Sequence, residues 1–214
     1  MHMKSRFFGP DRPTYHHGRL KEALIDAARE LVAERGPAGF TLAEAAKRVG
    51  VTGAAPYRHF ADRNALMNEL ALRGFAMFDV QQRQAWADGK PDAVTAFRRM
   101  GRTYLAFSRA EPGLYAAMFA AREVVKAGAV SPVADAAFET LLMATVAVLA
   151  QYGVPAGGAA DLASEIWAMS HGVAMLTMNG FLDASRQGCD PVLIQDRGVS
   201  SLIEMAIRRA KATL

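Results

Sequence analysis

The segment "GVTGAAPYRHFADR", residues 50–63, decides how this chain is interpreted. It begins like the turn and second helix of a helix-turn-helix, but Pro56 stands where that second helix should be under way. A proline costs about 3 kcal/mol in a helix interior and little within the first turn. Either Thr52 or Gly53 can cap the helix, and with Gly53 as the cap Pro56 forfeits no hydrogen bond. The sequence therefore predicts an irregular first turn, with the helix proper starting at residue 53 or later.

Helical patterns surround this segment. Apolar spacing and breakers predict helices over residues 18–35, 41–50, within 52–60, and 62–86. At the start of the second helix, Thr41 and Glu44 have the spacing of a capping box. Two short helices joined by a tight turn cannot bury enough apolar surface by themselves, so they must pack on the first and fourth helices. This is the geometry of a helix-turn-helix.

The remainder of the chain is also helical in pattern, and strand signals are almost absent. Further helices are predicted over residues 91–110, 112–121, 131–152, 156–182 and 191–212, with a loop at 122–130. We therefore expect an all-α protein of about nine helices. Its expected parts are a flexible basic arm (1–16), a three-helix helix-turn-helix domain (17–63) and a helical body (64–214).

The charge distribution agrees with a DNA-binding N-terminal part. The chain has a net charge of +4. Residues 1–63 contain 11 basic and 7 acidic side chains, whereas residues 64–214 contain 14 of each. The whole excess of positive charge thus lies in the first third of the chain, which indicates an anion-binding module attached to a neutral body.

The short helix after the turn has two different faces. Pro56 and Phe60 are four residues apart, so they share one side of the helix and should pack on the first and fourth helices. On the opposite side, Arg58 can donate to guanine O6 and N7, and alanine methyl groups can contact thymine methyls. Neighbouring polar side chains suit phosphate oxygens. The expected DNA contacts are Thr41, Thr52, Gly53, Ala54, Ala55, Tyr57, Arg58, His59 and Arg63.

Residues 16–66 resemble the N-terminal domain of TetR-family transcriptional regulators. The stretches that carry the resemblance are "HHGRLKEALIDAARELVAERG" and "FTLAEAAKRVGVTGAAPYRHFADRNAL". The matching positions are Thr41, Gly50-Val51-Thr52, Tyr57 to Phe60 and Leu66, with Arg63 where the family commonly has Lys. The resemblance implies a regulator, most often a repressor, that a small molecule releases from a pseudo-palindromic operator on double-stranded DNA.

The stretch "EIWAMSHGVAMLTMNG", residues 165–180, resembles the C-terminal ligand-binding domain of the Trp/His-Gly (WHG) type, through Trp167 and His171-Gly172. This resemblance implies a homodimer in which the last two helices of each chain form a four-helix interface. Such a dimer would present two recognition elements about 34 Å apart, one turn of DNA.

Trp167, His171 and Met175 recur every four residues, which places them along one side of a helix. Two interpretations of His171 stay open: a neutral core histidine bonded to a neighbouring hydroxyl or carbonyl, or a polar group in a ligand pocket. Eleven methionines suit an adaptable cavity for a largely apolar effector. The expected wall consists of Phe78, Tyr104, Phe107, Tyr115, Met118, Phe119, Trp167, His171 and Met175, with Phe75 as a further candidate.

Other classes of protein find little support. A lone Cys189 excludes an internal disulfide and a cysteine-based zinc cluster, and a structural thiol is favoured over a nucleophile. The adjacent His16 and His17 are poor metal ligands, so we expect no metal and no cofactor. Polar residues interrupt the apolar run 166–182, which favours a core helix over a membrane span. We expect a cytoplasmic protein; the alternatives are a helical protein–protein adaptor or an enzyme that lacks a recognisable motif.

Overall fold

The computed structural model describes residues 17–120, 131–183, 185 and 188–212. The predicted arm (1–16) and the predicted loop (122–130) lie outside the described residues. Within those ranges the chain is all-α, as predicted. The α-helices are α1 (His17–Arg35), α2 (Leu42–Arg48), α3 (Arg63–Trp86), α4 (Ala93–Ala110), α5 (Pro112–Ala120), α7 (Ser131–Gln151), α8 (Ala159–Met178) and α10 (Pro191–Ala212).

The described residues contain eight α-helices, one fewer than expected, and the difference lies at the proline. The predicted third α-helix is a single 3-10 turn, η1 (Ala55–Arg58), in which Pro56 is buried. The amides of His59 and Phe60 both donate to the carbonyl of Pro56, at 2.9 Å each. An irregular turn was predicted, but the α-helix expected to follow it was wrong. The chain leaves the turn at Phe60, and the next α-helix begins at Arg63.

Side-chain caps fix where the flanking helices begin. The hydroxyl of Thr41 accepts a hydrogen bond from the amide of Glu44, and the Glu44 carboxylate accepts one from the amide of Thr41, which confirms the capping box. Asp62 accepts from the amide of Ala65 at 2.8 Å and starts α3. These bonds satisfy amides that have no partner within their own helix.

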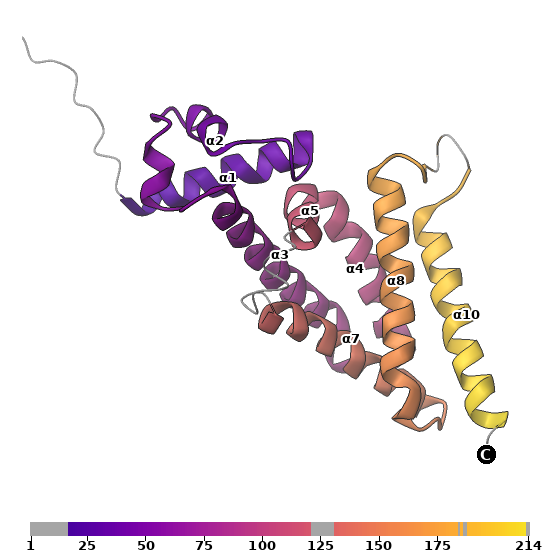
Figure 1. Ribbon diagram of the computed structural model, residues 1–214. Coiled ribbons are helices and arrows are strands. Elements are labelled where there is room, and N and C mark those ends of the chain that lie inside the picture. Colours follow the sequence, from indigo (N-terminus) through magenta and orange to yellow (C-terminus); the bar gives the residue numbers. More distant parts are fainter. Residues whose placement is uncertain (1–16, 121–130, 184, 186–187, 213–214) are drawn as a thin grey trace, which may run out of the picture.

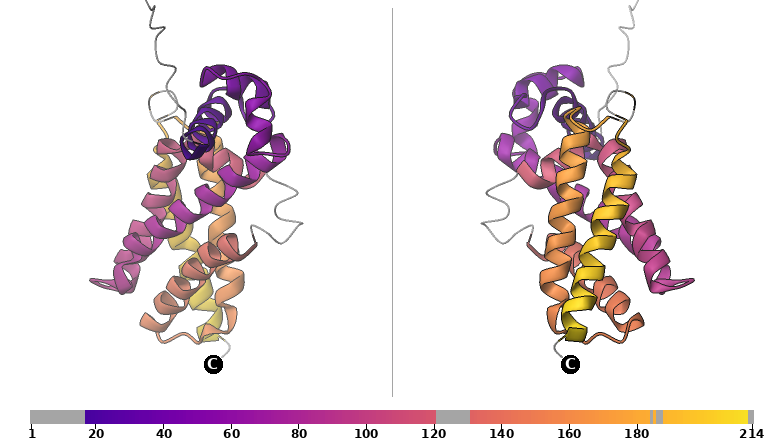
Figure 2. Two further views of the ribbon diagram at one scale, coloured as in Figure 1. Left: turned by 90° about the vertical axis from the view of Figure 1, so that its left-hand side faces the viewer. Right: turned by 90° about the vertical axis from the view of Figure 1, so that its right-hand side faces the viewer.

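Figure 1 shows α1 and α2 at one end of the molecule, with α3 running from them into the body. Helices α8 and α10 run antiparallel and side by side along the opposite edge, and both views in Figure 2 agree. One apolar cluster runs continuously from Leu24 and Phe40 at the helix-turn-helix, through Leu70 on α3, to Tyr115 in the body. Because the two parts share this core, a change in the body can reach the helix-turn-helix through packed side chains.

One stretch of the described residues, Pro132–Gln151, is long and apolar enough to cross a membrane by length and composition. It lies in α7, which packs against α3, α4 and α8. The predicted apolar run 166–182 falls mainly in α8 and does not meet the same criterion.

Candidate functional site: a helix-turn-helix surface and a cavity in the body

The helix-turn-helix presents a small exposed surface around η1. Pro56 and Phe60 are buried, as their spacing predicts. Tyr57 is 61% exposed, and Arg58 is exposed beside it. The other residues predicted to contact DNA from this segment are exposed at Thr52, Gly53 and Ala54 and half-buried at Ala55 and His59. The turn therefore turns its apolar residues inward and its aromatic and cationic side chains outward.

The two remaining predicted DNA contacts are engaged within the protein. The Thr41 hydroxyl belongs to the capping box of α2 and is exposed at its start. The Nε of Arg63 donates to the carbonyl of Phe40 at 3.0 Å, and its guanidinium lies 4.9 Å from the centre of the Phe40 ring. Arg63 therefore links the start of α3 to the segment before α2, which holds the two short elements in register.

The body encloses a cavity of about 670 Å³. Its wall is formed by side chains from α3, α4, α5, α7, α8 and α10. Of the predicted wall residues, the structure brings together in this lining Phe78, Tyr104, Tyr115, Met118, Phe119 and Trp167, together with Phe75. The volume and the aromatic wall are typical of sites for small, mainly apolar ligands.

Three predicted wall residues are not in the lining: Phe107, His171 and Met175. Phe107 is buried behind Phe78, with the two ring centres 5.4 Å apart. Met175 is 37% exposed on the outer side of α8. Residues four apart on a helix differ by 40° in direction, so two such steps spread Trp167, His171 and Met175 over about 80°. Only Trp167 of the three reaches the cavity.

His171 lies directly behind the wall and holds two tyrosines that do line it. The Tyr115 hydroxyl lies 2.8 Å from Nδ1 of His171, and the Tyr104 hydroxyl lies 3.1 Å from that of Tyr115. Burial lowers the pKa of His171 and raises the pKa of Tyr104 to about 12; it also raises the pKa of Tyr115. All three groups are therefore neutral at pH 7 and form a hydrogen-bonded chain, in which each hydroxyl can donate or accept according to the tautomer of His171.

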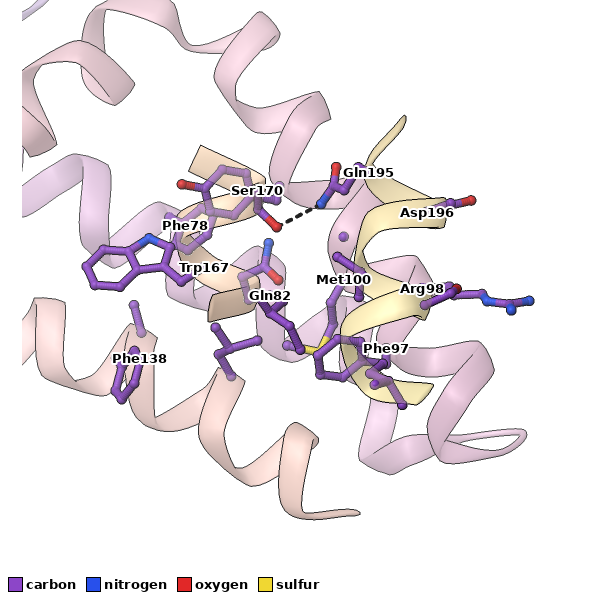
Figure 3. Close-up of a pocket in the computed structure, with 18 of the residues that line it drawn as sticks. Phe78, Gln82, Phe97, Arg98, Met100, Phe138, Trp167, Ser170, Gln195 and Asp196 are labelled. Atoms are coloured by element: carbon purple, nitrogen blue, oxygen red, sulfur yellow. Dashed lines mark hydrogen bonds between the residues drawn. The ribbon is translucent and has the colours of Figure 1, made fainter. Parts of the chain in front are cut away.

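Buried polar residues that the sequence analysis missed also line the cavity: Gln82 on α3, Ser170 on α8 and Gln195 on α10. The amide nitrogen of Gln195 donates to the Ser170 hydroxyl at 3.1 Å (Figure 3). The signal was present in the sequence. Gln82 continues the side of α3 that carries Phe75 and Phe78, and polar residues on an otherwise apolar helix face are informative.

The charged residues of the lining are Arg98, Asp135, Asp196, Glu204 and Arg208. All of them are exposed except Asp196, which is half-buried and pairs with Arg102 at 3.1 Å. Charge is therefore confined to the more exposed part of the lining, and the buried part of the wall is neutral.

Helix α5 connects the cavity to the helix-turn-helix. It contributes Tyr115, Met118 and Phe119 to the lining and packs directly on α1. A Cβ atom on Gly113 would lie 2.1 Å from the carbonyl oxygen of Arg29, so the two backbones are as close as a glycine allows. The Arg29 guanidinium also bonds Glu111, just before α5, at 3.3 Å. Helices α5 and α1 are therefore in direct backbone contact and are also joined by an ion pair.

A second connection joins α1 to α3. Arg73 bonds Glu22 with two nitrogens and Glu69 with one. The hydrogen bonds and charges of these carboxylates raise the pKa of Arg73, and Arg73 lowers the pKa of Glu22. Both partners are ionised at pH 7, so this contact fixes the angle between α1 and α3 by charge-assisted hydrogen bonds.

Within the described residues no group of three or more His, Cys, Asp or Glu is placed to hold a metal ion. Of the two adjacent histidines, His16 lies outside that part of the chain. Cys189, the single cysteine of the sequence, is half-buried.

Comparisons with known proteins agree with this geometry. Residues 24–70 match the family described as bacterial regulatory proteins, tetR family. Residues 97–195 match the family described as tetracyclin repressor-like, C-terminal domain. The two matches together span more than half of the chain, one on the helix-turn-helix and one on the body.

Two curated relatives are uncharacterised HTH-type transcriptional regulators. YobS of Bacillus subtilis is 29% identical over 47% of this chain and 51% of its own length, so the chain matches about half of that relative. Rv0681 of Mycobacterium tuberculosis is 24% identical over 76% of this chain and 72% of its own length.

A solved structure of a protein of unknown function from Rhodococcus sp. RHA1 superposes with a TM-score of 0.72 at 28% identity. The superposition covers 93% of this chain and 99% of that one. The matched families contain DNA-binding regulators rather than enzymes, which sets the enzyme alternative aside. The chain belongs to the TetR family of bacterial transcriptional regulators.

Proposed function

We propose that this protein is a ligand-responsive repressor of transcription, which a small and largely apolar molecule releases from a pseudo-palindromic operator. The observation that carries the proposal is the continuity of α3 and the shared core. One end of α3 completes the helix-turn-helix, and the same helix supplies Phe75, Phe78 and Gln82 to the cavity. A regulator that works in this way belongs in the cytoplasm, with the DNA that it reads.

On the DNA side, the proposed division into residues 17–63 and 64–214 assigns operator binding to the exposed surface around η1. Arg58 is its exposed cation and is proposed to read a guanine edge. Tyr57, His59 and the start of α2 at Thr41 are proposed to contact phosphates. The bare exposed positions Gly53 and Ala54 allow a close approach of the backbone to the groove.

On the ligand side, an effector in the cavity would act through α5. Tyr115 and Phe119 line the cavity from the same helix whose Gly113 touches the backbone of α1. An effector that fits the cavity better when α5 is displaced would tilt α1 and change the spacing of the two recognition elements. It can shift that equilibrium only by its difference in affinity for the two arrangements.

The proposed dimer interface is formed by α8 and α10. Their outer sides expose Leu176 (46%) and Met205 (38%), and Leu193 is exposed near the start of α10. The small, exposed Ala168 lies on the side of α8 that carries Met175, seven residues away, and permits close helix contact. Two copies joined through this face would form a four-helix interface. The helix-turn-helix of each copy would lie at the end of the molecule that is uppermost in Figure 2.

The test is binding of the purified protein to the DNA upstream of its own gene, by fluorescence anisotropy between about 50 and 200 mM salt, with a footprint on the same DNA. We expect a protected palindrome and a steep loss of affinity with salt, because phosphate contacts release counterions. Affinity equal to that for random DNA at every salt concentration would overturn the regulator and would favour a protein–protein adaptor.

A further inference from the structure

The wall of the cavity contains buried hydrogen-bonding groups that no described residue satisfies. Gln82 is 5% exposed and Gln195 is 2% exposed. Within the described part of the chain, the amide nitrogen of Gln82 and the amide oxygen of Gln195 have no hydrogen-bond partner. Buried amides are almost always satisfied in folded proteins, so each such group requires an explanation.

The unsatisfied groups lie in one region of the cavity. Figure 3 shows Gln82 reaching from α3 toward the pair formed by Ser170 and Gln195 on α8 and α10. Gly101 on α4 lies beside Gln195, and a Cβ there would stand 3.1 Å from its amide nitrogen. Ser170 and Gly101 thus position Gln195, and the cluster offers hydrogen bonds from two directions.

The cluster is polar but uncharged. The charged residues of the described lining are exposed or, at Asp196, half-buried and paired, so none of them accompanies the two amides in the buried part of the wall. A charged ligand group placed there would lose its hydration without gaining a counter-ion, which is strongly unfavourable. A neutral group with its own donor and acceptor would exchange its hydrogen bonds to water for hydrogen bonds to the two amides.

We propose that the effector is an uncharged, largely apolar molecule that carries both a hydrogen-bond acceptor and a donor, such as a carboxamide, held by Gln82 and by the Gln195–Ser170 pair. The amide nitrogen of Gln82 donates to the ligand's carbonyl oxygen. The Nε2 of Gln195 is engaged by Ser170, so its unpaired Oε1 accepts from the ligand's N–H. The aromatic wall takes the apolar part. This inference rests on the proposed function, since it assumes that the cavity is the effector site.

The experiment uses displacement of the uncharged fluorescent probe N-phenyl-1-naphthylamine from the full-length protein. Three competitors share an eight-carbon chain and differ only in the head group: octanamide, octanoate and octylamine, which is cationic at pH 7. We expect octanamide to displace the probe at concentrations at least about tenfold lower than the other two. Such a difference corresponds to about one well-formed hydrogen bond combined with the cost of burying a charge.

Gln82→Met and Gln195→Met keep side chains of similar length and remove the amides. We expect each variant to bind the operator within about twofold of the wild type and still to bind the probe, but to lose most of its preference for octanamide. Gln84→Met is the matched control, because Gln84 lies on the same helix and is exposed. A damaged fold would also lose operator binding, so operator binding by each variant separates the two effects.

The outcomes distinguish failure of the neutral-ligand proposal from failure of the cavity as the effector site. Probe binding with octanoate equal to or better than octanamide would overturn the neutral-ligand proposal and leave the effector site standing. A preference for octanamide that survives both glutamine substitutions would also overturn it. No binding of the probe to any variant, with intact operator binding, would instead remove the cavity as an effector site.

Discussion

The hydroxyl of Tyr115 on α5 lies 2.8 Å from Nδ1 of His171 on α8, and the two rings stack with their centres 5.8 Å apart. Tyr115 lines the cavity, whereas His171 stands behind it. This pair joins the helix that touches α1 to a helix of the proposed dimer face. Of the two interpretations that the sequence left open, the geometry resembles the neutral histidine bonded to a hydroxyl; His171 as a ligand contact stays a prediction.

The pKa of His171 predicts how stability changes with pH. Burial lowers this pKa in the folded protein below the ordinary value of about 6.5. Below about pH 6.5 the unfolded chain therefore takes up a proton that the folded protein refuses, and stability falls as the pH falls. We expect the melting temperature to decrease from pH 7.5 to 5.5 by more in the wild type than in His171→Asn, which retains an acceptor near Nδ1 and does not titrate.

Thermal melts of both proteins at the two pH values give the comparison directly. Equal decreases in the wild type and in His171→Asn would mean that His171 does not stay neutral when folded.

Arg58 is predicted to carry direct readout of the operator. It is exposed on η1, and a bidentate contact with guanine is worth about 1–3 kcal/mol of discrimination. We expect Arg58→Ala to weaken operator binding by about tenfold to a hundredfold and to relax the preference at one or two positions, while affinity for random DNA changes little. Competition binding against operators with single base changes measures this.

The matched control is Arg83→Ala, which removes the same charge from an exposed position near the C-terminal end of α3. If Arg58→Ala lowers affinity for operator and random DNA by the same factor, Arg58 contacts phosphate and the proposed readout is wrong.

Thr41 is predicted to act mainly through the capping box. Its hydroxyl accepts from the amide of Glu44 at 3.2 Å and donates to the Glu44 carboxylate at 3.1 Å. Thr41→Ala should cost about 1 kcal/mol of stability through loss of this cap, whereas Thr41→Ser should restore it. Chemical denaturation of the three proteins separates them. A stable Thr41→Ala protein that binds DNA poorly would instead make the hydroxyl a phosphate contact.

How much the sequence could predict depends on how local each cause is. Thr41 and Glu44 interact over three residues, so the capping box was readable from spacing alone. The irregular turn at Pro56 was predictable because proline restricts the backbone angles of its own and the preceding residue. That the turn would not become an α-helix depends on Phe60 being anchored in the core and on Asp62 starting a new helix, and neither constraint is visible within residues 52–60.

The cavity was predictable in kind but not in detail. Aromatic residues on several helices suggested a wall, and many of them meet there. The place of Gln195 in the cavity wall was not predictable, because it depends on Ser170 and Gln82, which lie on two other helices. Only the packing of α3, α8 and α10 brings these residues together, and no local pattern encodes it.

The proposed dimer depends on apolar side chains on the outside of α8 and α10. Leu176→Glu combined with Met205→Glu would place four carboxylates in the symmetric interface, where burial without partners is unfavourable. We expect this double variant to sediment as a monomer and to bind the operator at least about a hundredfold more weakly, since the half-sites are no longer linked. Analytical ultracentrifugation and anisotropy provide the two readouts.

Val80→Glu serves as the control, because Val80 is 52% exposed on α3, away from the proposed interface. It should remain a dimer. A dimeric Leu176→Glu, Met205→Glu protein would place the interface elsewhere.

Gly113 tests whether α5 transmits the state of the cavity to α1. In Gly113→Ala the new methyl group would lie 2.1 Å from the Arg29 carbonyl oxygen, and neither group can rotate away because both are fixed to backbone. The helices must separate, at a cost of about 1–3 kcal/mol. Since Tyr115 and Phe119 move with α5, we expect weaker operator binding without any effector and an altered affinity for N-phenyl-1-naphthylamine in the same variant.

Gly157→Ala, where nothing lies within 4 Å, should change neither property. A Gly113→Ala protein that is less stable yet binds operator and probe normally would show that α5 supports the fold without coupling the two sites, and the connection through Arg73, Glu22 and α3 would then be the route to examine.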